Sequence, residues 1–148
     1  MSNEITYAKV LARVESAAKD IIDEVAPMPK DSSEEAWQEF ADKLEALLDG
    51  EARDYARESV DSWDWIIYTY QGFQVYDALL SSEQNDAEQQ WEECGGYETA
   101  KDNSEGPYEI ACHIAFFALV DMLAQEIERQ CEEMQELAQD KIWQLERE

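Results

Sequence analysis

The sequence predicts an all-α fold, a small helical bundle formed by one domain over residues 1–148. Apolar residues recur at intervals of three and four over most of the chain, which is the period of an amphipathic helix. Glycine and proline fall between these periodic segments rather than inside them. Apolar residues make up 45% of the chain, which is enough for one hydrophobic core at this length.

The first helix is predicted over residues 4–25. Its apolar stripe consists of Tyr7, Leu11, Val14, Ala18, Ile21, Ile22 and Val25. Pro27 and Pro29 cannot continue a helix, so the chain breaks there.

A second helix is predicted to begin at Ser32, which forms a capping box with Glu35 three positions on. Gly50 is well placed to end it. The buried face is expected to contain Trp37, Phe40, Leu44, Leu47 and Leu48.

A third helix is predicted from Glu51 toward Gly72, although Trp65 to Tyr70 is aromatic and β-branched enough to form one short strand instead. Residues 73–80 favour another short helix. The segment 81–107 is rich in Gly, Asn and acidic residues, so we expect a short helix flanked by loops.

The last helix is predicted to be long. Pro107 suits a first helical position, and apolar residues then recur every three or four positions to Leu145. A continuous helix would have about 40 residues and a length of roughly 60 Å, more than a compact domain of this size requires. Its distal part is therefore expected to pair with a second chain, which would make the protein a homodimer, or the helix is expected to be broken.

The chain has no uninterrupted apolar run as long as a membrane span, and residues 1–24 mix acidic and basic side chains where a signal peptide needs an apolar stretch. Cys94, Cys112 and Cys131 form neither an even set nor a CxxC motif, which favours reduced thiols packed as small apolar side chains. Both observations indicate a cytoplasmic protein.

Acidic residues dominate the charge of the chain. There are 36 Asp and Glu against 11 Lys and Arg, so the formal net charge is −25. Such a molecule repels DNA, RNA and anionic lipid, and it attracts basic surfaces at rates that salt reduces. We expect a basic protein partner, no direct binding of nucleic acid and no membrane.

Two groups of acidic residues are candidates for binding that partner. No Lys or Arg lies between Arg57 and Lys101, and from this base-free segment we select Asp86, Glu88, Glu92 and Glu93. On the last helix a row of carboxylates follows at four-residue steps of about 6 Å, namely Glu128, Glu132, Glu136 and Asp140. Like charges at this spacing destabilise a helix by about a few tenths of a kcal/mol per pair, so the row is expected to serve a purpose other than stability.

In its size, acidity and helical pattern the chain resembles the acidic DNA-mimic inhibitors that phages and mobile elements direct against host restriction or CRISPR systems. The resemblance implies that carboxylates replace DNA phosphates against the Lys and Arg of a nuclease or surveillance complex. It implies stoichiometric blocking of DNA access, with no turnover and no cofactor. One helical row has only about a quarter of the charge density of duplex DNA, so several acidic helices or a dimer would have to contribute.

Two other functions remain open. The chain could be a phage or bacterial interaction or assembly protein whose long helix pairs through apolar residues such as Ile127 and Met134, with the acids only keeping it soluble. It could also be a Mg²⁺-dependent nucleotide hydrolase, because Glu133-x-x-Glu136 resembles half of the paired motif of all-helical nucleotide pyrophosphohydrolases. The carboxylates that would hold the metal are Glu88, Glu92, Glu93, Glu132, Glu133 and Glu136.

Other chemistry has less support in the sequence. The single histidine, His113, shares a helix face with Glu109, but such a pair is a frequent coincidence and no nucleophile elbow or phosphate-binding loop accompanies it. The aromatic residues Trp63, Trp65, Tyr68 and Tyr70 have no basic neighbours that would bring nucleic acid to them, so we expect them in the core. We therefore expect no metal site and no enzyme. A salt-adapted, solvated surface is the simplest alternative account of the acids.

Overall fold

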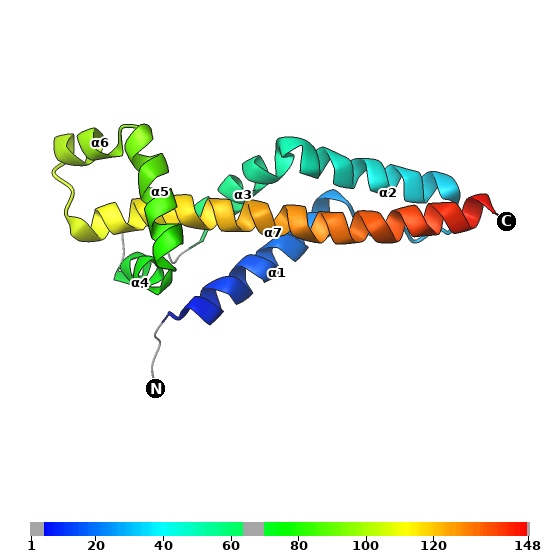
Figure 1. Ribbon diagram of the computed structural model, residues 1–148, viewed down its shortest axis with the longest axis horizontal. Helices are drawn as coiled ribbons and strands as arrows, with labels where there is room; N and C mark the ends of the chain where they lie inside the picture. Colours follow the sequence, from blue (N-terminus) through cyan, green and yellow to red (C-terminus); the bar gives the residue numbers. More distant parts are fainter. Residues whose placement is uncertain (1–4, 64–69, 148) are drawn as a thin grey trace.

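The structure is a computed structural model that describes residues 5–63 and 70–147 (Figure 1). These residues form the helices α1 (Tyr7–Val25), α2 (Glu34–Ala46), α3 (Ala52–Asp61), α4 (Tyr70–Ala78), α5 (Ser81–Glu93), α6 (Gly96–Asp102) and α7 (Pro107–Glu146). The all-α prediction, with its long C-terminal helix, is confirmed. The strand alternative concerned Trp65 to Tyr70; residues 64–69 lie outside the described part of the chain, and Tyr70 begins α4.

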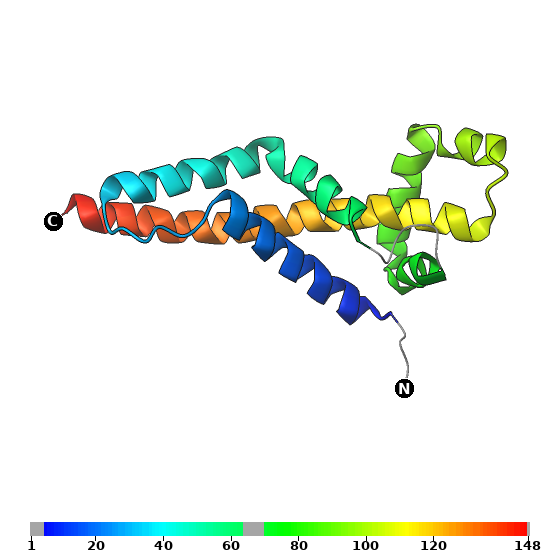
Figure 2. The ribbon, with the colours of Figure 1, turned by 180° about the vertical axis from the view of Figure 1, so that it is seen from behind.

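Helix α7 is the axis of the molecule. It runs without a break for 40 residues from Pro107, which occupies the first turn, as its missing N–H and fixed φ allow. Helices α1, α2, α3, α4 and α5 all contact α7. Seen from both sides, α2 and α3 follow one flank of α7, α1 crosses α7 at an angle, and α4, α5 and α6 gather around its N-terminal end (Figures 1 and 2).

The core follows the apolar stripe of α7. Leu119, Leu123 and Ile127 are fully buried at the centre of the helix. Farther along, Ala138 and Ile142 are also buried, because α2 covers this distal part of α7. The apolar stripe that suggested pairing with a second chain is thus covered within the chain itself, and the helix is not broken.

Helix α7 contains a stretch that is long and apolar enough, by length and composition, to cross a membrane. More than half of that stretch, 56%, is buried inside the protein. The core helix of a bundle has the same composition, because it is apolar on most sides.

Two predictions for α1 and α2 need correction. In α1, Val14, Ala18 and Ile22 are buried as predicted, but Leu11 is exposed and Val10 is buried in its place. The N-cap of α2 is Ser33, whose Oγ accepts from the Ala36 N–H at 3.2 Å, rather than Ser32. Gly50 ends the second helix, as predicted: its non-helical φ of 121° interrupts the segment Leu47–Glu51 that links α2 to α3, and glycine adopts this conformation without steric cost.

Residues 81–107 form two helices, α5 and α6, where one helix flanked by loops was predicted. Gly95 turns the chain between them with a left-handed φ of 79°. Gly96 then lies directly under the Trp91 ring, and Tyr97 packs edge-on against the same ring, with centroids 4.6 Å apart. The two glycines suggested a loop, but they belong to a hairpin of two helices. Gly95 forms its turn, and Gly96 allows the backbone to approach the Trp91 ring closely.

The cysteines differ in their surroundings. Cys112 and Cys131 are buried, as expected, whereas Cys94 is exposed. The expectation of burial is wrong for Cys94 because this residue caps the C-terminus of α5 at the surface, next to the Gly95 turn.

Replacing Gly96 by Ala should destabilise the protein by about 1–3 kcal/mol, because the added Cβ would overlap the Trp91 ring. The free energy of unfolding in urea measures this effect. The matched control is Gly106→Ala, where a Cβ meets only the flexible Glu109 carboxylate at 3.0 Å and stability should change by less than about 0.5 kcal/mol. Equal stability of the two variants would contradict the packing of Gly96 against Trp91.

Candidate functional site

The four carboxylates predicted on the long helix all lie in the distal half of α7. Glu132, Glu136 and Asp140 are exposed, and Glu128 is half-buried. A step of four residues turns an α-helix by about 400°, so each carboxylate is displaced by about 40° from the one before it. The row therefore winds around α7, from the edge of the core at Glu128 to the solvent-facing side at Asp140.

Glu128 marks the border of this row with the core. Burial, and secondly the nearby Glu128 carboxylate, raise the pKa of the Cys131 thiol to about 11. The thiol is therefore neutral at physiological pH and behaves as a small apolar side chain.

Glu132, Glu136 and Asp140 surround a shallow surface hollow of about 570 Å³ together with Gln135 and Gln139. Within the described part of the chain, none of the three carboxylates takes part in a hydrogen bond or an ion pair. We call these three residues the α7 acidic face. It presents negative charge that no cation of the described chain neutralises by contact.

The four carboxylates of the base-free segment lie on α5, on two flanks of that helix. At about 100° per residue, Asp86 and Glu93 fall on one side of the buried Ala87–Trp91 stripe, and Glu88 and Glu92 on the other. Asp86, Glu92 and Glu93 are exposed. Glu88 is half-buried and accepts a hydrogen bond from the Tyr97 hydroxyl.

The α5 carboxylates and the α7 acidic face form separate surfaces. Helix α5 crosses the N-terminal half of α7 (Figure 1), where the Trp91 and His113 rings are stacked with centroids 6.5 Å apart. Since an α-helix rises about 1.5 Å per residue, His113 lies roughly 28 Å from Glu132 along the α7 axis. The eight predicted residues therefore lie on two separate surfaces, one on α5 and one on distal α7, and do not form one continuous face.

Two arginines form ion pairs with carboxylates of the described chain. Arg53 of α3 binds Asp121 of α7 at 2.7 Å and also donates to Gln90 of α5 at 3.1 Å. Arg129 binds Glu126 at 2.7 Å and Glu133 at 2.6 Å. The Arg129 guanidinium holds the pKa of Glu126 below its usual value.

These contacts bear on the hydrolase alternative. Glu133, the residue that half of a pyrophosphohydrolase motif would need, is an ion-pair partner of Arg129. Glu88, Glu92 and Glu93 lie on α5, away from Glu132, Glu133 and Glu136 on distal α7. Among residues 5–63 and 70–147, no group of three or more His, Cys, Asp or Glu is placed to hold a metal ion.

His113 has a structural contact. Its Nε2 lies 2.7 Å from a Glu105 carboxylate oxygen, in a half-buried position. The bond joins the loop before α7 to the helix itself, and Trp91 stacks on the ring. Glu109, the predicted neighbour of His113, is half-buried one turn before it on α7.

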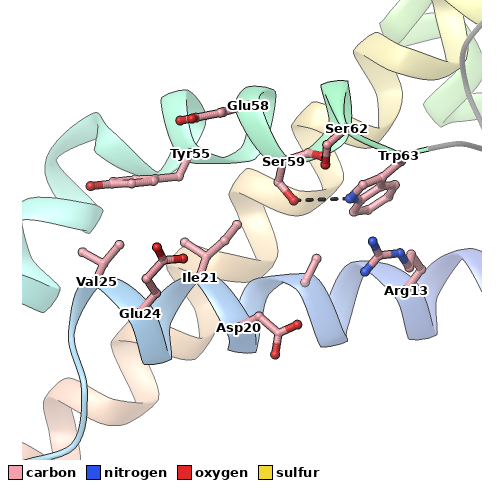
Figure 3. A pocket seen from close by; sticks show the side chains of 11 residues that line it. Arg13, Asp20, Ile21, Glu24, Val25, Tyr55, Glu58, Ser59, Ser62 and Trp63 are labelled. Atoms are coloured by element: carbon pink, nitrogen blue, oxygen red, sulfur yellow. Dashed lines mark hydrogen bonds between the residues drawn. The ribbon is translucent and has the colours of Figure 1, made fainter.

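A groove between α1 and α3 is a further candidate site that the sequence did not reveal. Its volume is about 690 Å³, and Figure 3 shows its lining. It is lined by three carboxylates, one guanidinium, two serine hydroxyls, two aromatic side chains and apolar side chains: Asp20, Glu24, Glu58, Arg13, Ser59, Ser62, Tyr55, Trp63, Ala17, Ile21 and Val25. We call it the α1–α3 groove.

One end of the α1–α3 groove is closed by Arg13 and Trp63. The Arg13 guanidinium carbon lies 4.5 Å from the centroid of the buried Trp63 ring, which is a cation–π contact. The Trp63 Nε1–H donates to the Ser59 Oγ at 3.3 Å. The sequence alone could have shown which residues share a helix face. Asp20 and Glu24 have helical spacing on α1, as do Tyr55 and Ser59 on α3 with Ser62 at its C-terminal end. It could not have shown that these two faces oppose each other.

Comparison with protein-family models, with curated proteins and with solved structures finds no match to this chain.

Replacing Glu88 by Gln should lower the pKa of Tyr97. Its hydrogen bond to Glu88, followed by desolvation and the charges of Glu88 and Glu92, raises this pKa from 10.0 to about 12. Because the folded-state pKa lies above the unfolded one, this bond stabilises the fold below about pH 10 and is lost as the pH rises through about 12. NMR titration of the Tyr97 ring carbon next to the hydroxyl measures the shift.

The control for this titration is Glu92→Gln, because Glu92 acts on Tyr97 only through its charge. It should lower the pKa of Tyr97 less than Glu88→Gln does. An equal effect of the two variants would mean that Glu88 is not held by Tyr97 and is as available to a partner as Glu92.

Proposed function

We propose that this protein binds the basic, nucleic-acid-binding surface of another protein or complex and blocks its access to DNA. The observation that carries the proposal is the α7 acidic face. Glu132, Glu136 and Asp140 are exposed around one hollow, without a hydrogen bond or ion pair to any described residue. These carboxylates are therefore available to bind cations of another molecule.

The free energy of this arrangement supports a partner of opposite charge. Neighbouring carboxylates at four-residue steps repel one another by about a few tenths of a kcal/mol per pair. Lys or Arg side chains of a partner would relieve that repulsion and form charge-assisted hydrogen bonds with the same carboxylates. The net charge of −25 would also speed the encounter with a basic surface.

The shape of the protein agrees with an extended partner site. Helix α7 spans roughly 60 Å, with the α7 acidic face toward one end and the carboxylates of α5 toward the other (Figure 1). A basic channel that normally holds a length of nucleic acid offers cations over a comparable distance. The resemblance to DNA-mimic inhibitors points to a nuclease or surveillance complex of a host defence system as the class of partner.

Charge reversal of the α7 row should abolish partner capture. In the test, the protein and a variant with Glu128, Glu132, Glu136 and Asp140 all changed to Lys are used to retrieve partners from host lysate, at about 0.05 M and about 0.5 M salt. The expected result is a nucleic-acid-binding complex that wild type retains at low salt, that added duplex DNA displaces, and whose affinity for the variant is at least about tenfold weaker.

The matched control reverses four exposed carboxylates elsewhere, Glu39, Glu45, Asp49 and Glu51. It changes the net charge by the same amount, so it should retain most of the binding if position matters more than total charge. A partner that is insensitive to salt, indifferent to DNA and held equally by all three proteins would overturn the proposal. The acidic residues would then only keep the protein surface hydrated and soluble.

A further inference from the structure

The α1–α3 groove combines features that suit a linear, flexible cation. Its volume of about 690 Å³ lies within the range of small-molecule sites. Three carboxylates, Asp20, Glu24 and Glu58, line it against the single guanidinium of Arg13. In Figure 3 the Glu24 side chain reaches from α1 toward α3, beneath Tyr55.

The groove already accommodates one cation of the chain itself. The Arg13 guanidinium rests on the Trp63 ring, 4.5 Å from its centroid, at one end of the groove. At the other end, Tyr55 offers a half-exposed ring and Glu24 a carboxylate, and no described cation contacts either of them. An aromatic face beside a carboxylate attracts an ammonium group through both its ring quadrupole and its charge.

The floor of the groove distinguishes between kinds of cation. Ala17, Ile21 and Val25 supply apolar surface to the same groove. Asp20 and Glu24 follow each other on α1 at a step of about 6 Å, similar to the separation of neighbouring nitrogens across a short methylene linker. A metal ion gains nothing from such a floor, whereas the methylene groups of a polyamine gain from leaving water.

We propose that the α1–α3 groove binds a linear polyamine, with one ammonium group between Glu24 and the Tyr55 ring, a methylene linker along Ile21, and Asp20 and Glu58 at the rim attracting the other ammonium groups. This site is distinct from the α7 acidic face and does not require the protein partner proposed above. A bound polyamine would join α1 to α3 across the groove.

The test is calorimetric titration of the whole protein with spermidine at about 0.15 M salt, where the general field of the protein is largely screened. We expect saturable binding of one spermidine per chain. The double variant Glu24→Gln/Glu58→Gln should weaken it roughly fivefold or more. Tyr55→Leu, which leaves the charge unchanged, should also weaken it, by at least about twofold.

The matched control is Glu132→Gln/Glu136→Gln, which removes the same charge from the α7 acidic face and should leave spermidine affinity within about twofold of wild type. Mg²⁺ at the same concentration as spermidine should not displace it. Equal losses in the two double variants, or displacement by Mg²⁺, would overturn the proposal, because spermidine would then be part of a general counterion atmosphere. Circular dichroism of each variant confirms that the helices remain folded.

Discussion

The structure depends on the burial of one stripe along a single 40-residue helix. Leu119, Leu123 and Ile127 are inaccessible to solvent at its centre, and α1 to α5 each pack against the same helix. Because no other element contacts so many partners, the shorter helices are ordered mainly by what they cover on α7. Their own repetitive patterns are short, and isolated helices of ten to fifteen residues are marginal in water.

That architecture separates charge from the core. Within the described residues no polar or charged side chain is buried, so nearly all of the net charge of −25 lies at or near the surface of a thin, elongated molecule. Two arginines form ion pairs: Arg53 joins α3, α5 and α7, and Arg129 binds two glutamates of its own helix. The consequence is a surface whose repulsion must be balanced by salt, by a partner or by small cations.

The two proposals divide that surface between two kinds of cation. The α7 acidic face is exposed and surrounds only a shallow hollow, which suits the side chains of a large basic partner. The α1–α3 groove is concave and has an apolar floor, which suits a small flexible one. The alternative of an assembly protein that pairs through the apolar side of α7 has less support, because Ile127 is fully buried by its own chain and Met134 is half-buried. Only scattered exposed groups such as Leu137 and Trp143 remain. A salt-adapted surface would explain the charge but not the groove.

The sequence by itself determined the helical class, the breaks at Pro27 and Pro29 and the length of α7, because helical periodicity and proline act locally. It also located the acidic rows, since their spacing along one helix is fixed by the helix geometry. It placed the break at Gly50 correctly, but it misjudged the Gly95–Gly96 pair, whose role depends on a neighbouring element: a tight turn between two helices and a close approach to Trp91. Only the tertiary structure decided that α2 covers distal α7, that Glu133 is tied to Arg129, and that Glu24 opposes Tyr55 across a groove. Contacts between helices distant in sequence depend on how whole faces pack, and no local pattern in either helix specifies its partner.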